Sequence, residues 1–94
     1  MITKYKDYCM ICGKPGPDVH HLVWGNSKRR CADEDQLVCP VCREHHEMFH
    51  QNREMQIMSH IAGQLLYERN KCAEGVPADE ARIMFRERYG ISYL

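Results

Sequence analysis

Cysteines and histidines stand at spacings that suit metal binding. The chain has six of each in 94 residues, and most of them lie between Cys9 and His50. Thiolate sulfur and imidazole nitrogen are the ligands that zinc prefers in proteins. Disulfide scaffolds belong mainly to secreted chains, and residues 1–8 carry two lysines without the apolar run of a signal peptide. We therefore expect reduced thiols, some of them metal ligands, in a cytoplasmic protein.

The pair Cys9 and Cys12 has the form of one half of a zinc site, because two thiolates three residues apart can hold one ion when the backbone turns tightly. Tetrahedral zinc needs a second half, and the sequence offers two choices. Cys39 with Cys42 would give four thiolates, whereas Cys42 with His45 would place both ligands on the first turn of a helix. We favour Cys42 and His45, because Cys39 falls within a predicted strand. Cys39 stays the alternative fourth ligand, and the ion expected here is a structural Zn²⁺.

Four further histidines could perform chemistry. His46 and His50 are four residues apart in a predicted helix, so their rings lie on one face and can chelate a single ion. His20 and His21 are adjacent in a predicted strand and point to opposite sides. That geometry suits one of them as a ligand and the other as a proton acceptor. The remaining residues of these types have no partner at ligand spacing, and we interpret them as structural: His60, Cys31 and Cys72.

Two short strands and a series of helices are predicted to position these side chains. The runs at 19–24 and 36–41 favour strands, and the polar segment 25–35 between them favours an irregular loop. From Cys42 onward the pattern is helical. Apolar spacings of three and four predict a second helix that ends near residues 74–75 and a third that ends before Gly90. Their predicted core faces are Met58, Ile61, Ala62, Leu65 and Leu66, and then Ala81, Met84, Phe85 and Tyr89.

The size of the chain predicts one α+β domain over 1–94, with a metal-binding core at 9–52 and a helical extension at 53–94. Thirteen Lys and Arg residues balance thirteen Asp and Glu residues, which argues against avid binding of nucleic acid by charge alone. The basic run Lys28, Arg29 and Arg30 lies close to the double histidine, and we predict that it contacts phosphates, with a solvated basic loop as the alternative. No stretch approaches the length of a membrane span, so no membrane interaction is expected.

These residues carry a resemblance to a known family. The stretch from Cys9 to His50, with VHH at 19–21 and CREHHEMFH at 42–50, resembles an HNH endonuclease, and especially the small HNH proteins of phages and prophages. The C-terminal RERYGISYL is similar to the tails of those proteins, although it is far less specific. The resemblance implies a small zinc-bound ββα-metal, treble-clef-like finger followed by a helical tail. It also implies cleavage that leaves a 3′-hydroxyl and a 5′-phosphate.

Carried over by position, the second histidine of the pair, His21, would be the general base. The first, His20, would hold a catalytic divalent metal together with His46 and His50, as in the DNase colicins, which these spacings resemble. Imidazole suits Zn²⁺ or Ni²⁺, and cellular availability would favour Mg²⁺ or Mn²⁺. A neutral imidazole, whose ordinary pKa is about 6.5, is a suitable proton acceptor at neutral pH.

The sequence departs from the family at its middle asparagine, which normally props the loop behind the catalytic histidine. Counting nine residues back from His46 gives Leu37, with Gln36 beside it, and the nearest asparagine is Asn26. Gln36 could replace the missing side chain if the register slips by one. The departure leaves open how His21 is oriented.

The sequence therefore predicts a metal-dependent HNH endonuclease that hydrolyses phosphodiester bonds in nucleic acid, which we expect to be double-stranded DNA. Cutting both strands with so small a domain would require a second copy of the chain or a phage protein partner. The alternative is a non-catalytic treble-clef zinc module that binds nucleic acid or a protein partner, or a purely structural zinc adaptor. Metal content separates these readings, because a nuclease can hold two ions per chain and a binding module holds one.

Overall fold

The N-terminal half is built on a two-stranded antiparallel sheet. The structure, a computed structural model, describes residues 1–25 and 27–94. Strand β1 covers Asp18–His21 and strand β2 covers Val38–Val41. Their register places His20 opposite Cys39 and His21 opposite Val38. Both strands are shorter than the sequence predicts, because the pairing ends where the chain leaves the sheet for the helix between them.

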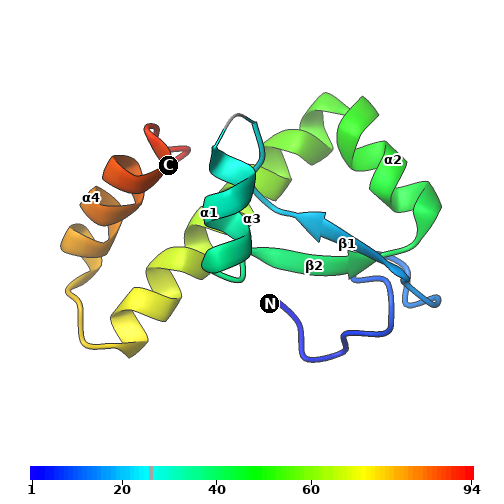
Figure 1. The fold of residues 1–94 in the computed structure, drawn as a ribbon, viewed down its shortest axis with the longest axis horizontal. Helices are drawn as coiled ribbons and strands as arrows, with labels where there is room; N and C mark the ends of the chain where they lie inside the picture. Colours follow the sequence, from blue (N-terminus) through cyan, green and yellow to red (C-terminus); the bar gives the residue numbers. More distant parts are fainter. Residues whose placement is uncertain (26) are drawn as a thin grey trace.

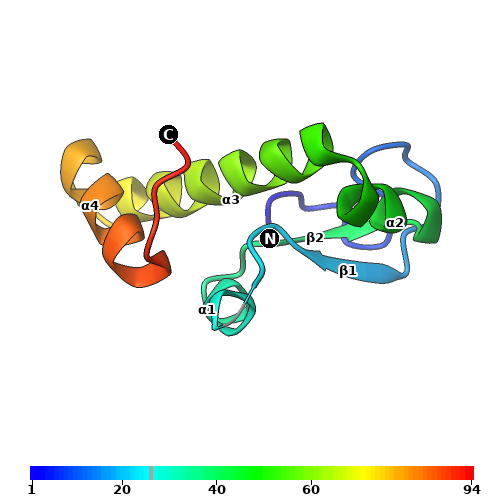
Figure 2. The ribbon, with the colours of Figure 1, turned by 90° about the horizontal axis from the view of Figure 1, so that it is seen from above.

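Four helices complete the α+β fold. Helix α1 (Lys28–Glu34) lies between the strands, and α2 (Arg43–Gln51) follows β2 directly. The long α3 (Arg53–Ala73) runs along the molecule and α4 (Ala78–Tyr89) returns beside it, as Figure 1 shows. In Figure 2, α3 lies above the strands and α1 below them. None of the helices in the described ranges is long and apolar enough to cross a membrane.

One cluster of buried side chains joins the sheet, α2 and the C-terminal helices. It includes Leu22, Leu37 and Val41 from the strands and their connections, and Phe49 from α2. From α3 and α4 it includes Leu66, Tyr67, Phe85 and Tyr89. The helical extension and the metal-binding segment therefore share one core. The predicted core face of α4 is confirmed, since Ala81, Phe85 and Tyr89 are buried.

The predicted core face of α3 is wrong in part. Met58 and Leu65 are 66% and 50% exposed, whereas Ser59 and Gly63 are buried. The reason is a close approach between α3 and the segment after β1: a Cβ added at Gly63 would lie 2.7 Å from Cγ2 of Val23. Only small side chains fit such a contact, so the face that packs is not the most apolar one.

The segment 25–35, predicted as an irregular loop, contains α1. Asn26, which the same prediction covered, lies outside the described residues. The helix has seven residues and buries only Ala32, so it has no apolar periodicity for the sequence to reveal. A helix this short is unstable alone and depends on tertiary contacts. Those contacts come from α4 and β1 and are described below.

Candidate metal centres

Four predicted ligands come together in a first group, which we call the knuckle site. The ligand atoms of Cys9, Cys12, Cys42 and His45 all lie within 4.8 Å of one another. Sγ of Cys42 is 3.2 Å from Nδ1 of His45 and 3.9 Å from Sγ of Cys12. Three sulfurs and one imidazole nitrogen at such distances can hold a single metal ion.

Local structure brings these ligands together. The backbone N–H of Gly13 donates to the carbonyl of Cys9 at 2.9 Å, which closes the turn between the first two cysteines. Gly13 has φ +75°, a conformation that favours glycine. Cys42 is the N-cap residue of α2, and His45 follows in the first helical turn. The backbone N–H of Met10 donates to the carbonyl of Pro40 at 2.9 Å and ties the turn to β2.

The charges of the knuckle site favour a bound cation. Burial raises the pKa of the Cys9 thiol, but hydrogen bonds from the backbone of Cys42, Cys12 and Ile11 lower it to about 6. At Cys12 a hydrogen bond from the backbone of Lys14 lowers the pKa, yet burial and the neighbouring sulfurs raise it above its ordinary value. Sulfurs this close repel one another as thiolates, and a metal ion would remove that repulsion.

Cys39, the alternative fourth ligand, lies outside the knuckle site. It is fully buried in β2, and this burial raises the pKa of its thiol to about 12. A thiol that stays protonated is a poor metal ligand. The structure therefore brings His45, and not Cys39, to the other three ligands. Cys31 and Cys72, predicted to be ordinary thiols, are free cysteines outside both ligand groups.

A second group, which we call the histidine site, consists of His20, His46 and His50. One nitrogen of each ring lies within 4.8 Å of the other two. His20 comes from β1, and the other two come from successive turns of α2. The ring centroids of His46 and His50 are 5.2 Å apart, as their spacing in the sequence predicts. The group can therefore chelate one ion between the sheet and α2.

The hydrogen bonds of Ser59 fix the tautomer of His20. The Ser59 hydroxyl donates to the carbonyl of Leu22 at 2.8 Å, and its oxygen lies 2.9 Å from Nε2 of His20. Because the hydroxyl proton is used, the oxygen accepts from an N–H on Nε2. Nδ1 of His20 then carries a lone pair, and this buried atom has no hydrogen-bond partner among the described residues. A metal ion would provide the partner that this buried nitrogen lacks.

Asp18 fixes the tautomer of His46 in the same way. Its Oδ2 accepts from Nδ1 of His46 at 3.0 Å and from Nε of Arg43 at 2.9 Å. The hydrogen bond with His46 and the charge of Arg43 hold the pKa of the Asp18 carboxyl below its ordinary value. A carboxylate on Nδ1 leaves Nε2 of His46 free, as in many metal-bound histidines.

Burial favours the neutral form of two rings of the histidine site, those of His20 and His50. Burial lowers the pKa of His20 to about 3, and the charges of His46 and His50 lower it further. Burial also lowers the pKa of His50, with smaller effects from His46 and Arg29. Neutral imidazole is the form that binds metals. The site is therefore competent for a metal ion at neutral pH.

The histidine site opens into a cleft of about 440 Å³. Its lining includes the three candidate ligands together with His21, Trp24 and Arg29. An adjoining hollow is lined by His21, Arg29, Arg30 and Asp33, so His21 and Arg29 border both spaces. Of the three predicted phosphate contacts, Lys28 lines neither space. The structure thus brings the predicted base and Arg29 to the cleft and places Arg30 in the adjoining hollow.

Several residues of the site were missed from the sequence. Asp18 stands two positions before His20 on the same strand, and this period of two could have indicated a shared face. Asp33 was missed because its segment, 25–35, was predicted to be an irregular loop and not a helix. Ser59 gives no signal, because a serine within a helical run is usually exposed. His60, predicted to be structural, lies outside both ligand groups, and its ring centroid is 4.4 Å from that of Trp24 and 4.7 Å from that of Tyr93.

Gln36, the predicted replacement for the missing asparagine, has a different role. It is exposed and has φ +59°, and its side-chain amide donates to the carbonyl of Asp33 at 3.2 Å. That bond closes the C-terminal end of α1. Among the described residues it makes no hydrogen bond to His21. The prediction that Gln36 props the catalytic histidine is therefore not supported by its contacts.

Comparison with known proteins identifies a family for the chain, and that family has no assigned activity. A family model described as "Protein of unknown function (DUF968)" matches residues 3–73, well over half of the chain. The "Uncharacterized protein YdfU" of Escherichia coli (strain K12) is 40% identical over 43 residues, which are 45% of this chain and 12% of that protein. The chain thus matches a small part of that relative's length. No solved structure matches the chain.

Proposed function

The chain belongs to the DUF968 family of proteins of unknown function, and we propose that it is a metal-dependent endonuclease of the HNH type. In this proposal β1, β2 and α2 form a ββα-metal finger with a structural Zn²⁺ at the knuckle site, and α3 and α4 form its helical tail. The histidine site holds a catalytic divalent ion. Zn²⁺, Ni²⁺, Mn²⁺ and Mg²⁺ are the candidates, with imidazole favouring the first two.

One observation carries the proposal: four histidines surround a single cleft beside two arginines. Three of the histidines converge as candidate ligands, and the fourth, His21, lines the same cleft and is not among those candidates. Its side chain is only 16% exposed. A zinc module that merely binds a partner would need the knuckle site alone. It would leave the histidine site, with its buried unpaired nitrogen, without a role.

The residue types fit phosphodiester hydrolysis. A divalent ion at the histidine site would act as a Lewis acid for the charge that develops on the phosphate. His21 accepts a proton from water, the water oxygen bonds to phosphorus, and the bond from phosphorus to the 3′-oxygen breaks. The 3′-oxygen then takes a proton from solvent, which gives a 3′-hydroxyl and a 5′-phosphate. Arg29 and Arg30 bind the phosphate oxygens.

We propose double-stranded DNA as the substrate. The formal net charge of the chain is zero, so binding should depend on a few arginines near the cleft and on the bound ion. The affinity should therefore be modest and sensitive to salt. Cleavage of both strands would need a second copy of the chain or a protein partner.

A plasmid-cleavage assay tests the proposal. Purified protein is supplied in turn with Mg²⁺, Mn²⁺, Ni²⁺ and Zn²⁺, beside His21→Ala and the control His60→Gln, which changes a histidine outside the cleft lining. Metal-dependent nicking should fall by about 100-fold or more in His21→Ala, the usual range for a lost general base, and persist in His60→Gln. No cleavage by folded, zinc-loaded protein would favour the non-catalytic binding module instead.

A further inference from the structure

His21 has one polar side-chain partner among the described residues, and it is not the one that the sequence predicts. Its Nε2 lies 3.4 Å from Oδ1 of Asp33. Asp33 is a residue of α1, the helix that replaces the predicted loop. The two side chains border the same hollow, together with Arg29 and Arg30. The contact therefore lies next to the cleft in which His21 would meet a substrate.

The chemistry of Asp33 determines which nitrogen of His21 carries the proton. The Asp33 side chain is 74% exposed, and the oxygens of a carboxylate accept hydrogen bonds. Its contact with His21 therefore requires an N–H on Nε2. In a neutral ring this leaves the lone pair on Nδ1. The nitrogen available to accept a proton from water is thus Nδ1.

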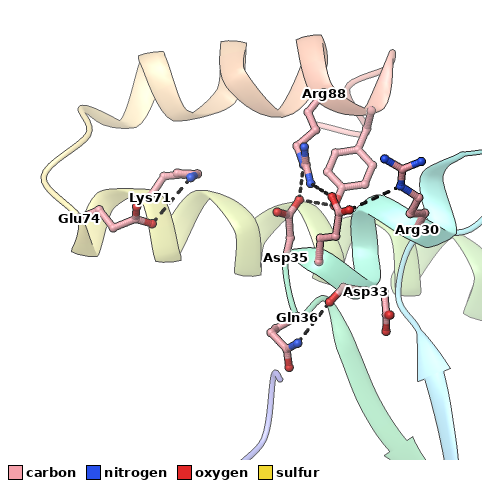
Figure 3. Close-up of polar contacts among 9 residues, drawn as sticks. Arg30, Asp33, Asp35, Gln36, Lys71, Glu74 and Arg88 are labelled. Atoms are coloured by element: carbon pink, nitrogen blue, oxygen red, sulfur yellow. Dashed lines mark hydrogen bonds and ion pairs between the residues drawn. The ribbon is translucent and has the colours of Figure 1, made fainter.

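The Asp33 carboxylate is available for this contact because the nearby side chains of Arg30 and Gln36 bond to other groups. Nε of Arg30, which borders the same hollow, lies 3.5 Å from Oε2 of Glu34, one turn along α1. Figure 3 shows the Asp33 carboxylate pointing away from the ion pairs on the other side of the helix. The amide of Gln36 bonds the backbone carbonyl of Asp33 and not its carboxylate. His21 is therefore the side chain that this carboxylate contacts.

The C-terminal helix holds α1 in place. Nε of Arg88 lies 2.6 Å from Oδ2 of Asp35, and its Nη2 lies 2.9 Å from Oε1 of Glu34 (Figure 3). The hydroxyl of Tyr89 donates to the same Oδ2 of Asp35 at 2.6 Å. These contacts fix the end of a seven-residue helix that could not persist alone. They give Asp33 a defined position relative to β1.

We propose that Asp33 is the positioning residue for His21. It holds the ring with the proton on Nε2 and presents Nδ1 to the attacking water. The proposal rests on the proposed function of His21 as general base. It links the helical tail to the reaction, because α4 anchors the helix that carries Asp33.

Two variants and a control test the proposal. Asp33→Ala removes the acceptor without weakening α1, since alanine favours helix more than aspartate does. It should lower kcat by about 10- to 100-fold and change KM by less than about twofold, because orientation of the base and not binding is lost. Asp33→Asn keeps a side-chain carbonyl and should recover part of kcat. Glu87→Ala, an exposed carboxylate on α4, should have no effect.

A spectroscopic measurement separates this proposal from the nuclease itself. Ring-nitrogen NMR at a pH where imidazole is neutral reports the tautomer of His21, assigned by the loss of its signals in His21→Ala. The wild type should show the proton on Nε2, and Asp33→Ala should show a mixture. A proton on Nδ1 of His21 in the wild type would overturn the proposal. So would an Asp33→Ala variant in which both the tautomer of His21 and kcat are unchanged. A protein that cuts nothing would overturn the proposed function, while the NMR result still decides whether Asp33 sets the tautomer.

Discussion

Oγ of Ser59 accepts a hydrogen bond from Nε2 of His20 at 2.9 Å, so a residue of the helical extension orients a ligand of the histidine site. Ser59 is almost fully buried, and its hydroxyl donates a hydrogen bond to the carbonyl of Leu22. Gly63, one turn further along α3, allows the close approach to Leu22 and Val23 that this geometry requires. The extension thus supports the candidate metal centre directly.

Ser59→Ala should weaken metal binding at the histidine site by about 10- to 100-fold, the usual effect of losing an outer-shell partner. Without the hydroxyl, Nε2 of His20 no longer has an acceptor, and the ring loses its preference for the tautomer with Nδ1 free. Ni²⁺ titration followed by the fluorescence of Trp24 measures this, since Trp24 is the sole tryptophan and its ring lies 5.1 Å from that of His50.

The matched control is Ser92→Ala, which removes a hydroxyl that bonds Gln64 near the C-terminus. It should leave the Ni²⁺ affinity unchanged. Zinc bound per chain at the knuckle site should be equal in both variants. Equal Ni²⁺ affinity in wild type and Ser59→Ala would show that Ser59 does not support the site.

Removing a knuckle ligand should disable the histidine site as well. Cys42 is both a knuckle ligand and the N-cap of α2, the helix that carries His46 and His50. Cys42→Ser should therefore lower the bound zinc, the melting temperature and the Ni²⁺ affinity together, because metal binding of this kind contributes directly to folding. Cys72→Ser, at an exposed thiol outside both groups, should change none of the three. Loss of zinc with an unchanged Ni²⁺ affinity would mean that the two sites fold independently.

The ligands could be predicted from the sequence because their spacing is local. Cys9 with Cys12 requires only a tight turn, and His46 with His50 requires only one turn of helix. These two spacings can be interpreted without knowledge of the tertiary structure. The α+β class and the C-terminal ends of the last two helices follow from periodicity and from the glycines near those ends.

The supporting residues could not be predicted, because tertiary contacts alone define them. Helix α1 is held by ion pairs from Arg88 to Glu34 and Asp35, which are far from Arg88 in the sequence. The packed face of α3 uses Ser59 and Gly63, so the apolar period pointed to Met58 and Leu65 on a more exposed side. Only small side chains fit this close contact, and a pattern of hydrophobic residues gives no information about the size of the side chains that pack.

Acid should destabilise the protein through His20. Its pKa is about 3 in the folded protein, and about 6.5 is expected when the ring is exposed by unfolding. Between these values the unfolded chain binds a proton that the folded protein excludes. The stabilising effect is therefore complete above about pH 6.5 and is lost as the pH falls toward 3. Urea unfolding without added divalent metal should lose up to about 1.4 kcal/mol per pH unit more in wild type than in His20→Gln. Parallel pH profiles would contradict this assignment.

Arg29 should contribute more to DNA binding than Lys28. Arg29 borders both the cleft and the adjoining hollow, whereas Lys28 lines neither. Fluorescence anisotropy with a labelled duplex, measured in the His21→Ala background to prevent cleavage, gives the affinity over a range of salt concentrations. Arg29→Ala should weaken binding and reduce the slope of log affinity against log salt by about one, the effect of one lost phosphate contact. Lys28→Ala should change the slope less, and Arg69→Ala, an exposed arginine on α3, should not change it. Equal slopes for all three variants would mean that DNA does not cross the cleft beside the histidine site.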